Sequence, residues 1–125
     1  MAEPAPDPLD LLREICLGLP EVPEKPSHGT PTFWVGGKTF AQYEDHLHGD
    51  TRVGVWLMAE GGAQEILVGG DPATFYRPPY VGYLGWVGIN LGGHVDWDQV
   101  SILVEAAYRV RAPKRLAGLL DPALD

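Results

Sequence analysis

The sequence predicts an α+β domain: a two-layer sandwich with an antiparallel sheet in one layer and the N-terminal and C-terminal helices packed on one face of that sheet. Three observations lead to this prediction. A helical pattern opens the chain, and a longer one closes it. Between them lie short runs rich in β-branched and aromatic residues. The turns between neighbouring runs are short, which favours antiparallel pairing.

The first predicted element is a helix that begins after Asp7. Pro8 suits the first helical position, and the Asp7 carboxylate caps the free backbone amides. Gly18 and Pro20 end the helix. Apolar residues recur at helical spacing and indicate one buried face: Leu9, Leu12, Ile15, Cys16 and Leu19. Cys16 on that face is interpreted as a small core hydrophobe, not as a nucleophile.

Three strands are predicted in the next part of the chain. Thr32–Val35 and Thr39–Tyr43 flank Gly36-Gly37. Glycine accepts the positive φ that a tight hairpin turn requires, so these two strands form a hairpin. Thr51–Met58 is the third strand, and its alternation places three aliphatic side chains on one face.

The second half of the chain continues with mixed elements. Gly62–Val68 is predicted to form a short helix, closed by two glycines. The stretch Asp71–Pro79 contains several prolines and is predicted to be irregular. Gly85–Leu91 is predicted to be a further strand.

The longest predicted helix runs from Asp96 to Arg111. Asp96 and Gln99 fit a capping box at its start. One stripe of this helix is apolar: Trp97, Val100, Val104, Ala107 and Tyr108. Pro113 stops the helix and begins another that ends near Leu120.

Composition indicates one globular domain over residues 8–120, with short flexible tails at 1–7 and 121–125. A single cysteine excludes an intramolecular disulfide, so the cytoplasm is the expected compartment. No apolar run approaches the ~20 residues of a membrane span, and the N-terminus lacks the features of a signal peptide. We therefore expect no membrane partner; the oligomeric state stays open.

The charge is unevenly placed along the chain, whose formal net charge is -8. Residues 1–71 hold 12 acidic and 4 basic side chains, whereas residues 72–119 hold 3 acidic and 5 basic ones. Attraction of the whole molecule to polyanions is therefore weak or repulsive, and nucleic-acid binding would have to be local. Four cations fall within seven residues and are here named the basic cluster: Arg109, Arg111, Lys114 and Arg115.

The basic cluster divides into two parts. Arg109 and Arg111 lie in the last turn of a predicted helix, where each cation gains ~0.3–1 kcal/mol from the helix dipole. Lys114 and Arg115 open the next helix, where positive charge is mildly unfavourable. They either reach back to the preceding carbonyls or bind an anionic ligand. Together with Lys25 and Arg77, the cluster forms the predicted set of anion-binding or nucleic-acid-binding residues.

Two motifs suggest ligand sites but are better explained by structure. Gly36–Thr39 resembles a phosphate-binding loop, yet Thr32 stands where its first glycine belongs, and a strand follows where a helix is needed. His46 and His48 lie in a polar loop without a third ligand at metal-binding spacing. We therefore expect no phosphate loop and no metal.

Catalytic residues and cofactors are not expected either. Ser27 and His28 are adjacent, so they cannot face each other as nucleophile and base without a turn, and no nucleophile elbow surrounds Ser27. Asp96 and Asp98 are explained by helix capping and the dipole. Most aromatic residues are expected in the core. Tyr80 and Tyr83 are expected to be exposed, where aromatic rings stack on nucleobases.

Several segments form a recognisable series: Leu19–Val22, Lys25–Phe33, Gly37–Ala41, Phe75–Tyr80, Gly85–Val87, Asp96-Trp97 and Ala107–Leu116. This series resembles the MmcQ/YjbR-like family of bacterial proteins of unknown function, over residues 9 to 118. The residues singled out from these motifs are Ser27, His28, Tyr80, Trp86, Trp97 and Tyr108. Relatives often carry basic residues where this chain has Trp34, Met58 and Tyr83-Leu84.

The resemblance implies an α+β fold likened to double-wing DNA-binding domains and to secretion-chaperone-like folds, with no enzymatic activity and no cofactor. The expected function is a non-enzymatic domain that binds DNA or another nucleic acid. The alternative is a protein-interaction or chaperone-like module. A third interpretation, a small-ligand site between Lys25–Phe33 and Tyr80–Trp86, requires a concave pocket between these segments.

Overall fold

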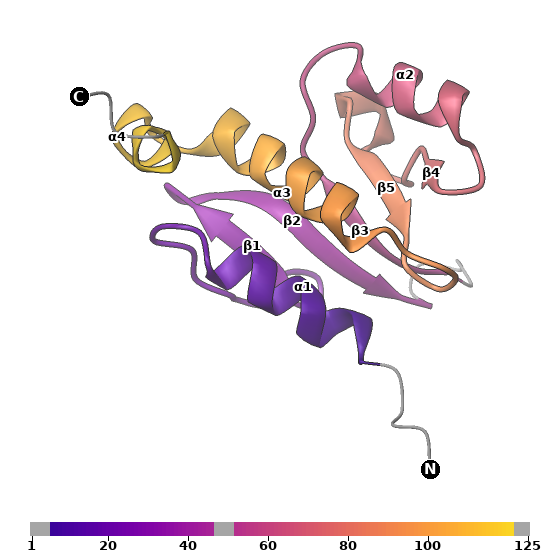
Figure 1. Ribbon diagram of the computed structural model, residues 1–125, viewed down its shortest axis with the longest axis horizontal. Helices are drawn as coiled ribbons and strands as arrows, with labels where there is room; N and C mark the ends of the chain where they lie inside the picture. Colours follow the sequence, from indigo (N-terminus) through magenta and orange to yellow (C-terminus); the bar gives the residue numbers. More distant parts are fainter. Residues whose placement is uncertain (1–5, 47–51, 122–125) are drawn as a thin grey trace.

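The fold consists of an antiparallel sheet with helices on one of its faces, as predicted (Figure 1). The structure, a computed structural model, describes residues 6–46 and 52–121. Five strands follow the order β1-β2-β3-β5-β4 across the sheet. Most of both predicted tails, and the predicted start of the third strand at Thr51, lie outside the described residues.

The strands agree with the predicted ones except at one edge of the sheet. Their bounds are β1 Thr32–Val35, β2 Lys38–Asp45, β3 Val53–Leu57, β4 Phe75–Tyr76 and β5 Val87–Asn90. Gly36 and Gly37 connect β1 and β2 with φ values of 58° and 78°, which confirms the predicted hairpin turn. β4 lies in the stretch predicted to be irregular. At two residues it is too short to produce an alternating pattern.

The predicted helices are present, and the last is divided in two. The helical elements are α1 Pro8–Leu17, α2 Ala63–Gly70, η1 Gly82–Leu84, α3 Trp97–Arg111, α4 Lys114–Ala117 and η2 Gly118–Leu120, where η marks a 3₁₀ turn. The Asp7 carboxylate accepts a hydrogen bond from the Leu9 amide at 2.8 Å. The Asp96 carboxylate accepts one from the Gln99 amide at 3.1 Å. Both predicted N-caps are therefore confirmed.

The main core lies between the sheet and the helices, and a bulge in β2 shapes it. Phe33 pairs with Ala41 and Trp34 with Thr39, so Phe40 has no partner on β1. This extra residue lets Phe40 and Ala41 both enter the core, where each is fully buried. The Phe40 ring meets the Tyr108 ring of α3 edge-on, with centroids 5.7 Å apart.

The other face of the sheet carries no helix of the described chain. A row of paired residues crosses all the strands on this helix-free face: Thr32, Gln42, Trp56, Gly88 and Tyr76. Trp56 and Tyr76 form a second hydrophobic cluster with Trp86, separate from the main core. The face without α-helices therefore has its own aromatic cluster, whose members are buried: Trp56, Tyr76 and Trp86 are 3%, 9% and 5% exposed.

Candidate functional site

A cavity of about 310 Å³ lies on the helix-free face. Its lining residues are His28, Gln42, Trp56, Tyr80 and Val81. Gln42 and Trp56 are paired on β2 and β3 and form its floor. His28 belongs to the segment beside the β1 edge, where Glu24 bridges to Phe33. Tyr80 follows β4 at the opposite edge, so loops from both edges meet above the floor.

A tight turn holds His28 at the cavity. Ser27 and Thr30 exchange backbone hydrogen bonds of 3.0 and 3.1 Å. Between them, His28 and Gly29 have φ values of 54° and 78°, as in a type I′ turn. This turn brings the Ser27 Oγ within 3.1 Å of the His28 Nδ1. The two side chains do meet, but no acidic side chain of the described residues orients the imidazole, as a catalytic triad requires.

Tyr80 forms the opposite wall, and its backbone is strained. Its φ is 65°, a value rare for a bulky residue. The Val81 amide donates a hydrogen bond of 2.7 Å to the Pro79 carbonyl, which closes a three-residue γ-turn around Tyr80. The side chain is 69% exposed. The strained turn therefore holds a large aromatic ring at the mouth of the cavity.

The floor of the cavity is fixed by aromatic and polar contacts. The Trp56 Nε1 donates a hydrogen bond to the Tyr76 Oη at 3.2 Å. The Arg52 guanidinium lies 4.0 Å from the centre of the Tyr76 ring. The Gln42 Nε2 donates to the Glu44 carboxylate at 2.6 Å. That bond fixes the amide orientation and leaves the Gln42 Oε1 as an acceptor without a partner among residues 6–46 and 52–121.

Both the sequence and the fold of the chain are similar to those of known proteins. Residues 17–110 match the family model described as YjbR. The chain belongs to the YjbR family. The crystal structure of the Deinococcus radiodurans protein DR2400, which has a DUF419 domain, is similar in fold, with a TM-score of 0.70 and 21% sequence identity. The similarity covers 82% of this chain and 76% of that one. Among curated proteins none matches the chain.

The structure separates the residues singled out from the YjbR-like motifs into two groups. Ser27, His28 and Tyr80 lie at the cavity or beside it, and Trp86 belongs to the second cluster. Trp97 and Tyr108 lie on α3, on the other side of the sheet. The Tyr108 Oη donates to the Pro20 carbonyl at 2.8 Å, which ties α3 to the segment after α1. Tyr108 therefore has a structural role, whereas Trp97 is partly buried and packs against the main core.

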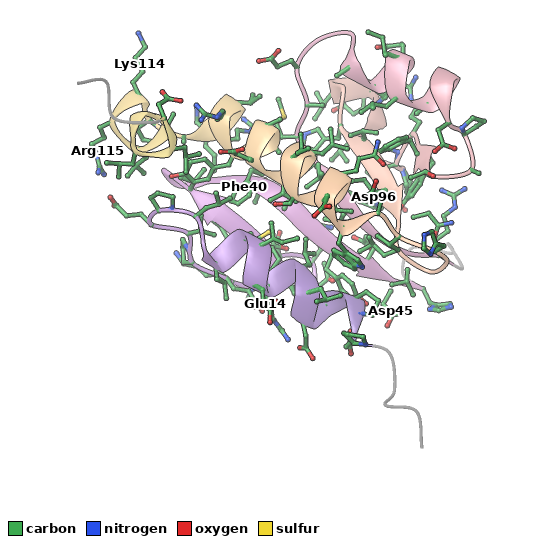
Figure 2. The ribbon with its side chains drawn as sticks, viewed as in Figure 1. Glu14, Phe40, Asp45, Asp96, Lys114 and Arg115 are labelled. Atoms are coloured by element: carbon green, nitrogen blue, oxygen red, sulfur yellow. The ribbon has the colours of Figure 1, made fainter. Side chains whose placement is uncertain are left out.

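The six predicted anion-binding residues of this YjbR-family protein do not converge on one surface. Lys25 lies beside the β1 edge of the sheet, and Arg77 follows β4 at the opposite edge. The basic cluster lies at the end of α3 and in α4, and Lys114 projects away from the fold (Figure 2). The Arg111 guanidinium lies 6.0 Å from the centre of the Trp86 ring.

Two members of the basic cluster are engaged in ion pairs. The Arg109 Nη2 lies 2.9 Å from the Asp121 carboxylate and 3.7 Å from that of Glu105. The Arg115 Nη1 lies 2.7 Å from the Glu21 carboxylate. From the sequence, the expected partners of Arg115 were the preceding backbone carbonyls or an anionic ligand. The structure shows Glu21 instead, 94 residues away in the chain, and no local pattern reveals that contact.

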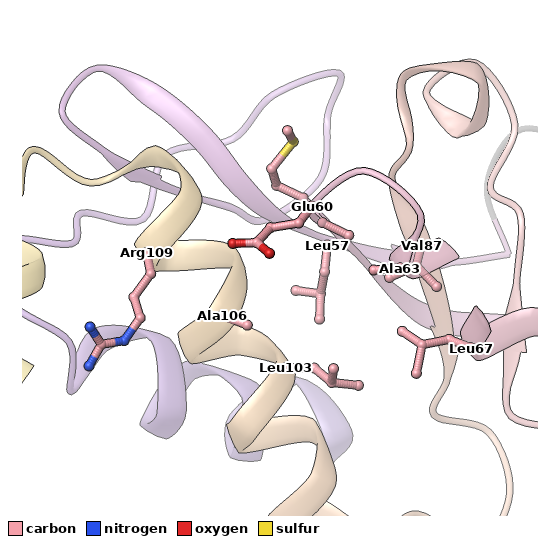
Figure 3. A pocket seen from close by; sticks show the side chains of 10 residues that line it. Leu57, Glu60, Ala63, Leu67, Val87, Leu103, Ala106 and Arg109 are labelled. Carbon is pink, nitrogen blue, oxygen red and sulfur yellow. The ribbon is translucent and has the colours of Figure 1, made fainter. Parts of the chain in front are cut away.

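A second cavity, of about 220 Å³, lies between α2, α3 and the sheet (Figure 3). Leu57, Leu67 and Leu103 point toward its centre, whereas the Arg109 guanidinium points away from it (Figure 3). Its interior therefore offers apolar packing and no group that binds an anion. The cavity on the helix-free face, in contrast, is lined by both aromatic and polar groups.

Two further features concern metals and membranes. Within the described ranges, no three histidine, cysteine or acidic side chains form a group that would hold a metal ion. His46 contacts its neighbour Asp45, and His48 lies outside the described residues. None of the helices that the structure describes has the length and apolarity to cross a membrane.

Gln42 and Trp56 line the cavity but were not predicted as site residues. The available signal was the alternation of side chains along the two strands. It places Gln42 and Trp56 on the face of the sheet opposite the aliphatic side chains. Alternation gives the face of a sheet but not the partner across it. That partner depends on the register, and the bulge at Phe40 shifts the register between β1 and β2.

Proposed function

We propose that this YjbR-family protein is a non-enzymatic domain that binds single-stranded nucleic acid on the helix-free face of its sheet. The observation that carries the proposal is the cavity between Trp56 and Tyr80. Nucleobases stack on aromatic side chains, at about 1–3 kcal/mol per base. A base reaches such a cavity only when it is unpaired, so a single strand fits better than a duplex.

The placement of charge supports the same preference. Duplex binding needs many cations along the phosphates. In this protein the net charge is -8, and Arg109 and Arg115 are already paired with carboxylates. Lys25 and Arg77 are exposed at the two edges of the sheet, and neither has an ion pair among the described residues. Both lie where they would contact a strand that crosses the helix-free face.

Within residues 6–46 and 52–121, the Ser27–His28 pair has no acidic partner, and the sequence around Ser27 has no nucleophile elbow, so we assign no reaction and no cofactor. Cys16 is the single cysteine and is fully buried, which fits a cytoplasmic protein.

Fluorescence anisotropy tests the proposal directly. A labelled single strand of about 12 nucleotides is titrated beside its duplex at about 50 mM salt. The single strand is expected to bind more tightly. Two phosphate contacts predict a log–log salt slope of about -1.4, from about 0.7 per phosphate. Absence of binding at micromolar protein, or a duplex that binds as tightly as the single strand, would refute the proposal.

Two tyrosines of one loop provide a matched pair of variants. Tyr80 lines the cavity, whereas the equally exposed Tyr83 does not. Tyr80→Ala is expected to weaken binding of the single strand about tenfold, the effect of losing one stacking partner. Tyr83→Ala is expected to leave the affinity within about twofold. Equal losses in both variants would place the strand on the loop and not in the cavity.

A second candidate function is a protein-interaction module, the alternative from the sequence. One observation favours it: Tyr80, Tyr83 and Leu84 expose 69%, 74% and 55% of their surface within five residues. Such a patch on a soluble domain often marks a partner surface. Light scattering would then show concentration-dependent dimers that Leu84→Ser disperses. A monomer at all concentrations, together with single-strand binding, would favour the first candidate.

A further inference from the structure

We propose that the cavity on the helix-free face takes one planar heterocyclic base that carries an exocyclic amino group, with the Gln42 Oε1 accepting a hydrogen bond from that amine. This inference deepens the proposed function and rests on it for the location of the site. The ligand class comprises adenine, cytosine and guanine, either as free nucleosides or within a strand. Thymine and uracil are excluded from it.

The volume of the cavity limits the ligand to one ring system. Ligand sites range from about 300 to 1,000 Å³, and this cavity, at about 310 Å³, is at the lower end. Trp56 provides an aromatic floor, and Tyr80 provides a second aromatic surface at the mouth. A planar base makes contact with both rings, whereas a flexible chain of the same volume loses more entropy on binding.

The Gln42 amide determines which base is accepted. Its Nε2 donates to the Glu44 carboxylate at 2.6 Å, a charge-assisted bond that holds the amide in one orientation. The Oε1 is therefore presented as an acceptor. An amino group satisfies this acceptor. Uracil and thymine offer only the N3–H, which is recessed between two carbonyl oxygens. Bringing that N–H to the Gln42 Oε1 also brings a carbonyl oxygen toward the same acceptor, so the bond is weaker than the one from a projecting amino group.

The two walls are formed before any ligand arrives. His28 is fixed by the type I′ turn and by its contact with Ser27, and Tyr80 is fixed by its γ-turn. A preformed site avoids the entropic cost of ordering loops on binding. Backbone strain at Tyr80 is then explained as the cost of keeping its ring over the cavity.

The first arm of the test uses free nucleosides. Adenosine, cytidine and uridine are titrated into the full-length protein while tryptophan fluorescence is recorded. Adenosine and cytidine are expected to bind about tenfold more tightly than uridine, the ratio for one discriminating hydrogen bond. Trp56→Phe identifies the signal, because quenching should decrease when the tryptophan at the floor is removed.

The second arm uses labelled homopolymers of about 12 nucleotides containing adenine, cytosine or thymine. The adenine and cytosine strands are expected to bind about tenfold more tightly than the thymine strand. Gln42→Leu is expected to abolish this preference by weakening only the amino-bearing ligands. If that variant fails to unfold cooperatively, the base preference of the wild-type protein decides the question alone.

The outcomes separate this inference from the proposed function. Equal binding of thymine and adenine strands overturns the inference and leaves single-strand binding intact. Adenosine binding with the expected preference, but no binding of any strand, supports the inference and overturns the proposed function. Binding of neither nucleosides nor strands overturns both.

Discussion

The ring of Tyr76 lies against the backbone of Gly88, its partner on β5. A Cβ at position 88 would overlap three ring carbons of Tyr76, and one at Gly54 would overlap its hydroxyl. Tyr76 in turn accepts the hydrogen bond from Trp56. Two glycines therefore position the aromatic residues that form and support the cavity floor.

Gly88→Ala is expected to destabilise the protein by about 1–3 kcal/mol, because an added methyl group forces a packed ring to move. It should also weaken ligand binding at the cavity, since Trp56 loses the support of Tyr76. Urea denaturation measures the free energy of unfolding, and fluorescence titration measures the binding.

Gly93→Ala is the matched control. A Cβ at Gly93 meets no atom within 4 Å, and this glycine has no positive φ. The expected change is within about 0.5 kcal/mol. Equal effects of the two substitutions would show that steric contact with Tyr76 is not the cause.

Because of the Arg115–Glu21 ion pair, we expect the difference in stability between the wild type and Arg115→Ala to depend on pH. The hydrogen bond from Arg115 lowers the pKa of the Glu21 carboxyl below its ordinary value. A lowered folded-state pKa stabilises the protein above the unfolded value of about 4.3, and this contribution is lost as the pH falls through the folded value. Arg115→Ala should therefore be less stable than the wild type near pH 7, by a small amount because both side chains are exposed. The difference should shrink as the pH falls from 7 to 3, as urea denaturation at both pH values would show.

Lys114→Ala is the control for that experiment, since Lys114 has no ion pair among the described residues. Its effect on stability should not change between the two pH values. Neither substitution should change single-strand affinity if binding occurs on the helix-free face. A loss of affinity in either variant would show that the basic cluster forms part of the binding surface.

Local chemistry predicted much of the fold. The positive φ of Gly36 and Gly37, the cap at Asp96 and the alternation of Val53, Val55 and Leu57 each depend on residues close together in the chain. Such features can be predicted because the backbone conformation and the residue that favours it are close together in the sequence. The bulge at Phe40 left no such signal, since the residue looks like any other strand aromatic.

The candidate site was less predictable because it joins distant segments. His28 and Tyr80 reach one cavity from opposite edges of the sheet, and each was recognised only through its own motif. Gln42 lines the same cavity because of the strand register between β2 and β3, which could not be predicted from the sequence. The pairing of Arg115 with Glu21 is equally non-local, and the two alternatives from helix electrostatics, the preceding carbonyls or a ligand, did not include it.

Removing the Tyr108 hydroxyl group is expected to lower the free energy of unfolding measurably. Its ring packs on Phe40, and its Oη donates to the Pro20 carbonyl at 2.8 Å. Tyr108→Phe keeps the ring contact and removes the donor, so a loss of about 1 kcal/mol is expected in urea denaturation. Tyr83→Phe, at an exposed hydroxyl, should change stability by less than about 0.5 kcal/mol. If the two losses are equal, the bond to Pro20 does not stabilise the fold.

The Cys16 thiol is expected to react only when the protein unfolds. Its side chain is fully buried, and burial raises the pKa of the thiol well above its ordinary value. The thiolate is the reactive form, so Ellman's reagent should modify the native protein slowly and the denatured protein quickly. A raised folded-state pKa also means that stability falls as the pH rises above about 8.5, where the unfolded thiol ionises. Cys16→Ala should lose that part of the alkaline destabilisation, whereas rapid labelling of the native protein would contradict the burial of Cys16.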